Sequence, residues 1–191
     1  VEHGRVLIMP QREKKLKHGT GGRTMNDRYL FKAKRVDNGE WVQGVPFEIE
    51  GKTVILIKDN ENLLRTHYLE ENMWTAEIYA IEVDPSTICQ CTGLKDKNGN
   101  LIWENDIVEL LGHRGVIKFT CGGFGIGYRK NIDWEEIQAN IMRITGCENI
   151  LYACENDNYI SLWEIYWNFN DEDDCLETVE VIGNIFDNKG V

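Results

Sequence analysis

The 191-residue sequence has no long apolar run. No stretch approaches the roughly 18–20 consecutive apolar residues of a membrane-spanning helix. The run Val6–Met9 is also shorter than the about 7–15 apolar residues of a secretion-signal core. These absences predict a cytoplasmic protein with no membrane partner.

Basic residues are also scarce. The chain carries 21 Lys and Arg residues against 32 Asp and Glu residues, a formal net charge of −11. Residues 1–24 hold six of the basic residues and only two of the acids, so residues 25–191 hold 15 basic and 30 acidic side chains. A body this acidic repels a phosphate backbone. General binding to nucleic acid is therefore not expected.

The cysteines lack the spacing of a metal site. Zinc sites pair their ligands as C-x2-C or in a closely related spacing, whereas two cysteines here stand as C-x-C and the others are far apart. An even cysteine number indicates a disulfide framework mainly in short secreted chains. We therefore expect reduced thiols, no metal and no cofactor at the six cysteines, which are Cys89, Cys91, Cys121, Cys147, Cys154 and Cys175.

Two short segments resemble ligand loops without matching them. The glycine-rich stretch Gly123–Gly127 has neither phosphate-loop fingerprint, and its strand flanks favour a strand with a bulge or close packing instead. The acidic run Asp171–Asp174 lacks the glycine and the distal glutamate of a calcium loop. It predicts a solvated acidic loop.

No residue spacing indicates a catalytic site. Residues 25–191 contain two histidines, His67 and His113. No Ser or Cys neighbours His113 in a nucleophile pattern, although a spatial pairing of His113 with Cys121 is left open. A group of aromatic residues near the C-terminus has acidic neighbours, which oppose stacking on nucleic-acid bases. Core filling or a protein interface is expected for this group, which comprises Trp163, Tyr166, Trp167 and Phe169. We predict no catalytic residue, and hence no enzyme.

Turn and strand signals alternate closely between residues 92 and 108. Asn98-Gly99 tolerates the positive φ angles of a tight hairpin, so Gly99 is expected to adopt one. The apolar residues Leu101–Trp103 predict a short strand, and a second turn leads into another strand at Ile107-Val108. Trp103 is the expected aromatic anchor of this hairpin.

This stretch resembles the signature of the YopX family of small phage and prophage proteins. That signature reads TGLKDKNG, two apolar residues and then EGDIV. The sequence here runs in a similar pattern from Thr92 through Gly99 to Glu104-Asn105-Asp106-Ile107-Val108. The preceding segment from Asp84 and the ending Val181–Phe186 are also similar to the family. The family has no established biochemical activity to carry over. The resemblance implies a phage setting and an SH3-like fold.

The expected fold is mainly β: an SH3-like small barrel with additional N-terminal β hairpins and one inserted α-helix at about 132–145. The helix follows from apolar residues at helical spacing after the capping residue Asp133. Three regions are predicted. Residues 1–24 form a non-native or disordered leader, 25–83 an N-terminal β subdomain, and 84–191 the barrel region with an insertion at about 129–175.

We therefore predict a non-enzymatic phage or prophage accessory protein that acts by binding a host or phage protein in the host cytoplasm. The acidic body, the absence of catalytic spacing and the many strands with edges for pairing favour this function. The alternative is a nucleic-acid-related role, either as an acidic DNA mimic or as an SH3-like module that contacts nucleic acid through the strand Tyr29–Arg35. An enzyme with an unrecognised site is a second alternative, and homo-oligomer formation is left open.

Overall fold

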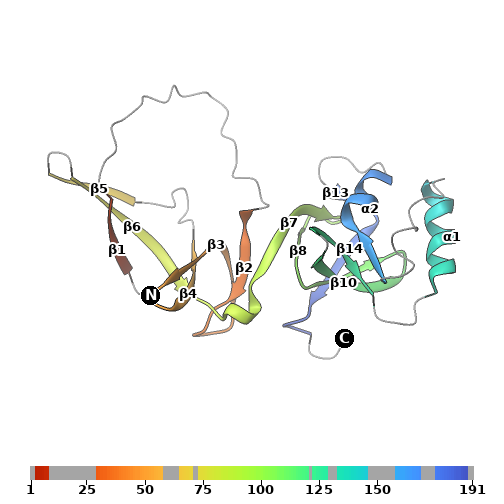
Figure 1. The fold of residues 1–191 in the computed structure, drawn as a ribbon, viewed down its shortest axis with the longest axis horizontal. Coiled ribbons are helices and arrows are strands. Elements are labelled where there is room, and N and C mark those ends of the chain that lie inside the picture. Colours follow the sequence, from red (N-terminus) through yellow and green to blue (C-terminus); the bar gives the residue numbers. More distant parts are fainter. Residues whose placement is uncertain are drawn as a thin grey trace, which may run out of the picture. The chain divides into compact units, whose positions relative to one another are not determined.

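The computed structural model confirms the mainly β class (Figure 1). The chain divides into two compact units, residues 1–90 and 91–191. The division falls inside strand β7 (Cys89–Asp96), whereas the expected boundary lay after residue 83. The structure describes residues 3–8, 29–57, 65–70, 73–120, 122–128, 133–145, 158–168 and 175–188.

The first unit is built from antiparallel strands in the order β1-β6-β4-β3-β2, with the start of β7 next to β2 and with β5 also paired to β6. Hairpin turns connect β2 to β3 and β3 to β4, as the Gly-containing turn signals predict. Ala33, Ile55 and Val83 are the buried core of this unit. Its strands are β1 (His3–Ile8), β2 (Phe31–Lys34), β3 (Trp41–Ile49), β4 (Lys52–Leu56), β5 (Arg65–Glu70) and β6 (Met73–Glu82).

The first strand corrects the expected leader. His3–Ile8 form β1, which pairs antiparallel with β6 from His3 opposite Tyr79 to Ile8 opposite Trp74. The segment ends in β-prone apolar residues, but its partner lies far along the chain. Local composition therefore gave no sign of the pairing. Residues 9–24 lie outside the described residues.

The second unit contains the rest of β7, its partners β8 and β13, and a five-stranded antiparallel sheet in the order β12-β11-β10-β9-β14. Helix α2 packs on β11 and β12, and its Leu162 and Ile165 join the buried core. Its strands and helices are β8 (Leu101–Trp103), β9 (Asp106–Leu110), β10 (His113–Thr120), β11 (Gly123–Gly127), α1 (Trp134–Thr145), β12 (Tyr159–Ser161), α2 (Leu162–Asn168), β13 (Cys175–Leu176) and β14 (Val179–Asn184). The short 3-10 helix η2 (Pro85–Thr87) belongs to the first unit and precedes β7.

The expected SH3-like barrel is not closed in the described part of the chain. The five-stranded sheet has β12 at one edge and β14 at the other. A turn rather than a further strand satisfies part of the β14 edge. The backbone N–H of Lys97 donates to the carbonyl of Val179, and the Asp96 side chain accepts from the N–H of Val181.

The inserted helix is confirmed as α1. It begins after Asp133, whose Oδ1 accepts the backbone N–H groups of Glu135 and Glu136 at 3.1 and 3.2 Å. A side-chain oxygen in this position satisfies N–H groups that the first turn leaves without a partner. The sequence located this helix because its cap and its apolar spacing are both local signals.

A second helix, α2, covers a segment whose apolar residues also fit the alternation of a strand. The alternation of Trp163, Ile165 and Trp167 indicated a strand face, but Leu162–Asn168 is helical. Leu162, Ile165 and Tyr166 face the core, whereas Trp163 is 62% exposed. Positions i, i+3 and i+4 share one helix face, so the apolar period is that of a helix. In a segment of seven residues, the strand period and the helix period both fit the same apolar residues.

Candidate functional site

The family-like signature folds into a hairpin between β7 and β8. The N–H of Asp96 donates to the carbonyl of Asn100 at 2.8 Å, and the N–H of Gly99 donates to the carbonyl of Asp96 at 2.9 Å. Gly99 has φ +81°, as the Asn-Gly dipeptide predicted. The turn therefore depends on a backbone conformation that glycine adopts without strain.

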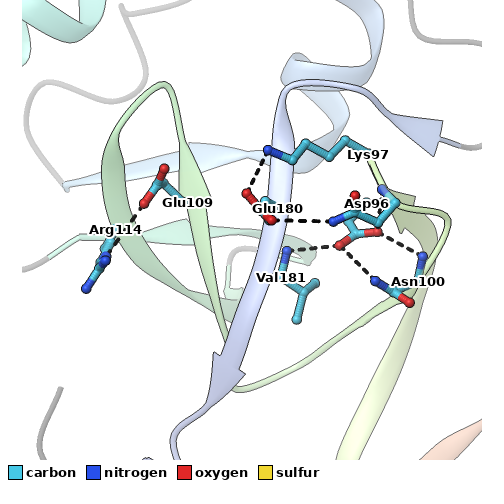
Figure 2. Close-up of polar contacts among 8 residues, drawn as sticks. Asp96, Lys97, Asn100, Glu109, Arg114, Glu180 and Val181 are labelled. Atoms are coloured by element: carbon cyan, nitrogen blue, oxygen red, sulfur yellow. Dashed lines mark hydrogen bonds and ion pairs between the residues drawn. The ribbon is translucent and has the colours of Figure 1, made fainter.

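The Asp96 carboxylate is the centre of this turn, and it is buried (Figure 2). Oδ1 accepts the N–H groups of Asn98 at 2.9 Å and Asn100 at 2.8 Å. Oδ2 accepts the N–H of Val181 at 3.0 Å and the side-chain amide of Asn100 at 3.3 Å. The carboxylate thus joins the turn at Asn98–Asn100 to β14, and its acceptor capacity is used inside the fold.

These contacts decide the ionisation of Asp96. Burial acts to raise the pKa of its carboxyl, but the hydrogen bonds from Val181, Asn100 and Asn98 outweigh burial and hold the pKa below its ordinary value. The carboxylate is therefore charged at neutral pH.

Acid is expected to remove the stability that Asp96 contributes. Because the folded-state pKa is depressed, this contribution is complete above the unfolded pKa of about 3.9 and is lost as the pH falls through the folded value. An NMR titration of the Asp96 carboxyl carbon should give a midpoint below about 3.9. A midpoint at or above that value would show that burial outweighs the hydrogen bonds.

A second buried carboxylate holds the next turn of the signature. Asp106 Oδ2 accepts the N–H of Trp103 at 2.8 Å, and Oδ1 accepts from the Asn184 side chain at 2.9 Å. Asn184 Oδ1 in turn accepts the N–H of Phe186 at 3.0 Å. The signature and the closing strand therefore form one hydrogen-bonded system. The acids of the two turns and the Asn of the closing strand were visible in sequence, but their connection was not.

Charged side chains form a row across the outer surface of β14, β9 and β10 (Figure 2). Lys97 Nζ lies 2.6 Å from Glu180 Oε2, and Arg114 Nε lies 3.6 Å from Glu109 Oε2. Glu180 and Glu109 are directly opposed across β14 and β9. The hydrogen bond between Lys97 and Glu180 raises the pKa of Lys97 and lowers that of Glu180. Each glutamate is paired with a cation, so the row is not a set of acids available for catalysis.

A different kind of surface lies on one side of β2 and β3. Lys32 Nζ and Lys34 Nζ stand over the Trp41 ring, 5.0 and 5.4 Å from its centroid. Strand alternation places Phe47 and Ile49 on the same side of β3 as Trp41, and they are 57% and 40% exposed. We call these five residues the β2–β3 face. The sequence indicated the basic strand but not the aromatic and apolar residues of β3 beside it.

The glycine-rich segment is a closely packed strand, as expected. A Cβ atom on Gly125 would lie 2.2 Å from the Tyr159 ring, and one on Gly127 would lie 3.0 Å from the Lys118 side chain. The Tyr159 hydroxyl donates to the carbonyl of Gly123 at 3.1 Å. The glycines make room for side chains of neighbouring strands.

Only part of the histidine and acidic-loop candidates lies within the described residues. His113 pairs with Leu110 at the start of β10, whereas Cys121 and Asp171–Asp174 lie outside the described residues. His67 lies in β5, and its side chain is also outside them. Among the described residues, no three His, Cys, Asp or Glu side chains form a group that could hold a metal.

The cysteines with described positions carry thiols. Cys89 and Cys91 are buried in β7, and Cys89 Sγ donates to the carbonyl of Thr87 at 3.3 Å. Cys175 Sγ donates to the carbonyl of Asp96 at 3.1 Å, which adds a further contact to the signature turn. These thiols therefore contribute to the folded structure through burial and hydrogen bonds to the backbone.

The C-terminal aromatic group is partly described. Trp163 and Tyr166 stack on α2 with ring centroids 6.5 Å apart, and Tyr166 packs against the core. The Trp167 side chain and Phe169 lie outside the described residues. The described pair combines one core residue with one exposed ring.

The comparisons with known proteins give one positive finding. A family model described as YopX protein matches residues 30–190, which is most of the chain and includes parts of both units. A search of curated proteins gave no match. No helix in the described ranges is both long and apolar enough to span a membrane.

Proposed function

The chain belongs to the YopX family, and from this premise we propose that it is a non-enzymatic phage or prophage accessory protein that binds a host or phage protein in the host cytoplasm. The signature's buried carboxylates, Asp96 and Asp106, bond within the fold. The signature motif therefore stabilises the fold. A surface that binds a partner is expected outside this motif.

The exposure of Phe47 and Ile49 on β3 is the observation that carries the proposal. Burying such a side chain contributes about 1.5–3 kcal/mol, and the free chain forgoes part of that contribution at both positions. Apolar groups that cluster on a surface mark interaction sites. A protein partner that covers them would recover this energy.

Affinity capture from phage-infected host cells tests the proposal. The wild-type chain should retain a protein saturably, and a Phe47→Ser/Ile49→Thr variant should retain much less of it. Phe119→Ser is the matched control, because Phe119 is a similarly exposed aromatic residue in the other unit.

The proposal fails if the wild-type chain retains no protein saturably from infected or uninfected cells. If the control loses the partner and the β3 variant keeps it, the binding function stands on a different surface. Identification of the captured protein as a DNA-binding protein would support the DNA-mimic form of the function.

A nucleic-acid role is the second candidate, and the two lysines over Trp41 favour it. Cations beside an aromatic ring also occur in proteins that bind single strands. Direct binding to an oligonucleotide must weaken with added salt in proportion to the phosphates contacted. The net charge of −11 opposes such binding.

A further inference from the structure

We propose that one edge of β6 is a strand-addition site for a partner protein, and that β1 of the same chain occupies this edge when no partner is bound. The partner supplies an extended segment in which a basic residue is followed by apolar residues. This inference goes beyond the proposed function, because it names a second surface and the chemistry of its ligand.

The first part of β6 has a neighbouring strand on each side. Residues 74–77 of β6 pair with residues 65–68 of β5 and also with residues 5–8 of β1 (Figure 1). β5 is followed directly by β6, whereas residues 9–30 separate β1 from β2. Among the described strands, β1 pairs with β6 alone. β1 is thus an outer strand that joins the sheet through one partner.

β1 also lies outside the part of the chain that matches the YopX family model. The match covers residues 30–190, and it therefore includes β5 and β6 but not residues 3–8. The edge of β6 belongs to the matched region, whereas the strand that covers this edge does not. An uncovered strand edge presents N–H and C=O groups that pair with an extended segment of another protein. β1 fills the edge in the same way as such a segment.

The register of β1 against β6 indicates which segments fit the edge. Arg5 is opposite Glu77, so residues of opposite charge occupy directly opposed positions. The next three residues of β1, at positions 6–8, are Val, Leu and Ile, and they are opposite residues 74–76. Main-chain hydrogen bonds give affinity at a strand edge, and the residue types along the segment give specificity. A basic residue followed by three apolar residues is therefore the expected ligand.

The charge of the chain also favours a basic segment. Residues 25–191 hold 15 basic and 30 acidic side chains. This excess of acid attracts a basic segment and repels an acidic one. A nucleic acid is repelled by the same charge, and it has no peptide groups with which to extend a sheet.

Fluorescence anisotropy with the full chain tests the inference, and the probe is a labelled peptide with the sequence of residues 3–8. Successive residues of a strand direct their N–H groups to opposite sides. In Val6→Pro/Leu7→Pro, one of the two prolines therefore removes an N–H that points to β6. This variant should release the edge and bind the peptide about ten-fold or more tightly than wild type does. Val6→Thr/Leu7→Thr keeps both N–H groups and should bind the peptide as wild type does.

Two altered peptides establish how the probe binds the proline variant. A peptide with proline in place of Val6 and Leu7 should not bind, because it cannot complete the backbone hydrogen bonds. A peptide with Arg5→Glu should bind several-fold more weakly, because it places a like charge opposite Glu77. Equal binding of the original and the proline-containing peptide would overturn the inference.

Circular dichroism and the thermal midpoint establish whether the proline variant is folded. A folded proline variant that binds no peptide overturns the inference. Hydrogen exchange of the wild-type chain provides a test that needs no substitution. With excess peptide, the amides of β1 should exchange faster while those of β6 stay protected. If the proline variant does not fold, unchanged exchange of β1 in the wild-type chain overturns the inference.

Gel filtration tests a second copy of the chain as the source of the strand. A wild-type dimer that becomes monomeric in the proline variant would show that β1 pairs with another copy, and this result overturns occupation of the edge within one chain. A wild-type monomer supports that occupation.

The capture experiment separates this inference from the proposed function. A partner retained through Phe47 and Ile49, together with no binding of the peptide, overturns the strand-addition site and leaves the protein-binding function supported. Saturable binding of the peptide, together with no retained partner, supports the strand-addition site while the proposed function fails.

Discussion

Replacement of Asp96 with Ala is expected to destabilise the second unit by about 3–5 kcal/mol. The carboxylate is 0% exposed and accepts three backbone N–H groups, from Asn98, Asn100 and Val181. Without it, these three N–H groups lose their acceptor, and a buried donor without a partner costs about 1–3 kcal/mol. Entry of water into the vacated space would offset part of this cost.

Urea unfolding measures this effect, with Glu180→Ala as the control. Glu180 precedes Val181, whose N–H binds Asp96, but the Glu180 side chain is 36% exposed and pairs with Lys97 at the surface. Screening makes such exposed pairs contribute little, so the control should unfold near the wild-type midpoint. The stability of Asp96→Asn should lie between the stabilities of wild type and Asp96→Ala. The Asn side chain keeps one acceptor oxygen, whereas the donors around Asp96 bind to two. An Asp96→Ala protein as stable as the control would contradict the prediction.

Truncation of Trp103 to Ala is expected to cost about 3–5 kcal/mol. Its side chain is 4% exposed, and its backbone N–H is fixed by Asp106. Removal of so large a buried ring loses its transfer energy and leaves a cavity that the surroundings fill only in part. Trp103 was expected to be the aromatic anchor of the signature hairpin, and its burial agrees with that role.

Trp163→Ala is the matched control, because Trp163 has the same type of side chain but is 62% exposed on α2. Both variants are compared with wild type by chemical unfolding, monitored by circular dichroism so that loss of a tryptophan does not change the probe. The Trp163 variant should lose far less stability than the Trp103 variant. A near-neutral Trp103→Ala would mean that the ring contributes little to packing.

The two largest predicted effects, at Asp96 and Trp103, fall in the signature stretch at residues 92–108. The contacts that cause them could not be deduced from that stretch alone. Local residue chemistry identified the turn at Gly99 and the strands on either side. It did not connect Asp96 to Val181 or Asp106 to Asn184, which are 85 and 78 positions apart in the chain. These connections explain why the carboxylates are structural.

The sequence by itself determined the features that depend on neighbouring residues: the positive φ of Gly99, the capped helix α1, the mainly β class and the family resemblance. Tertiary structure alone decided the partner of β1, the helical form of α2, the open five-stranded sheet and the position of Phe47 and Ile49 beside the lysines over Trp41. A turn or a cap is fixed by contacts within a few residues. Strand pairing, and the choice between two periods in a short apolar segment, are fixed by burial against residues far away in the chain.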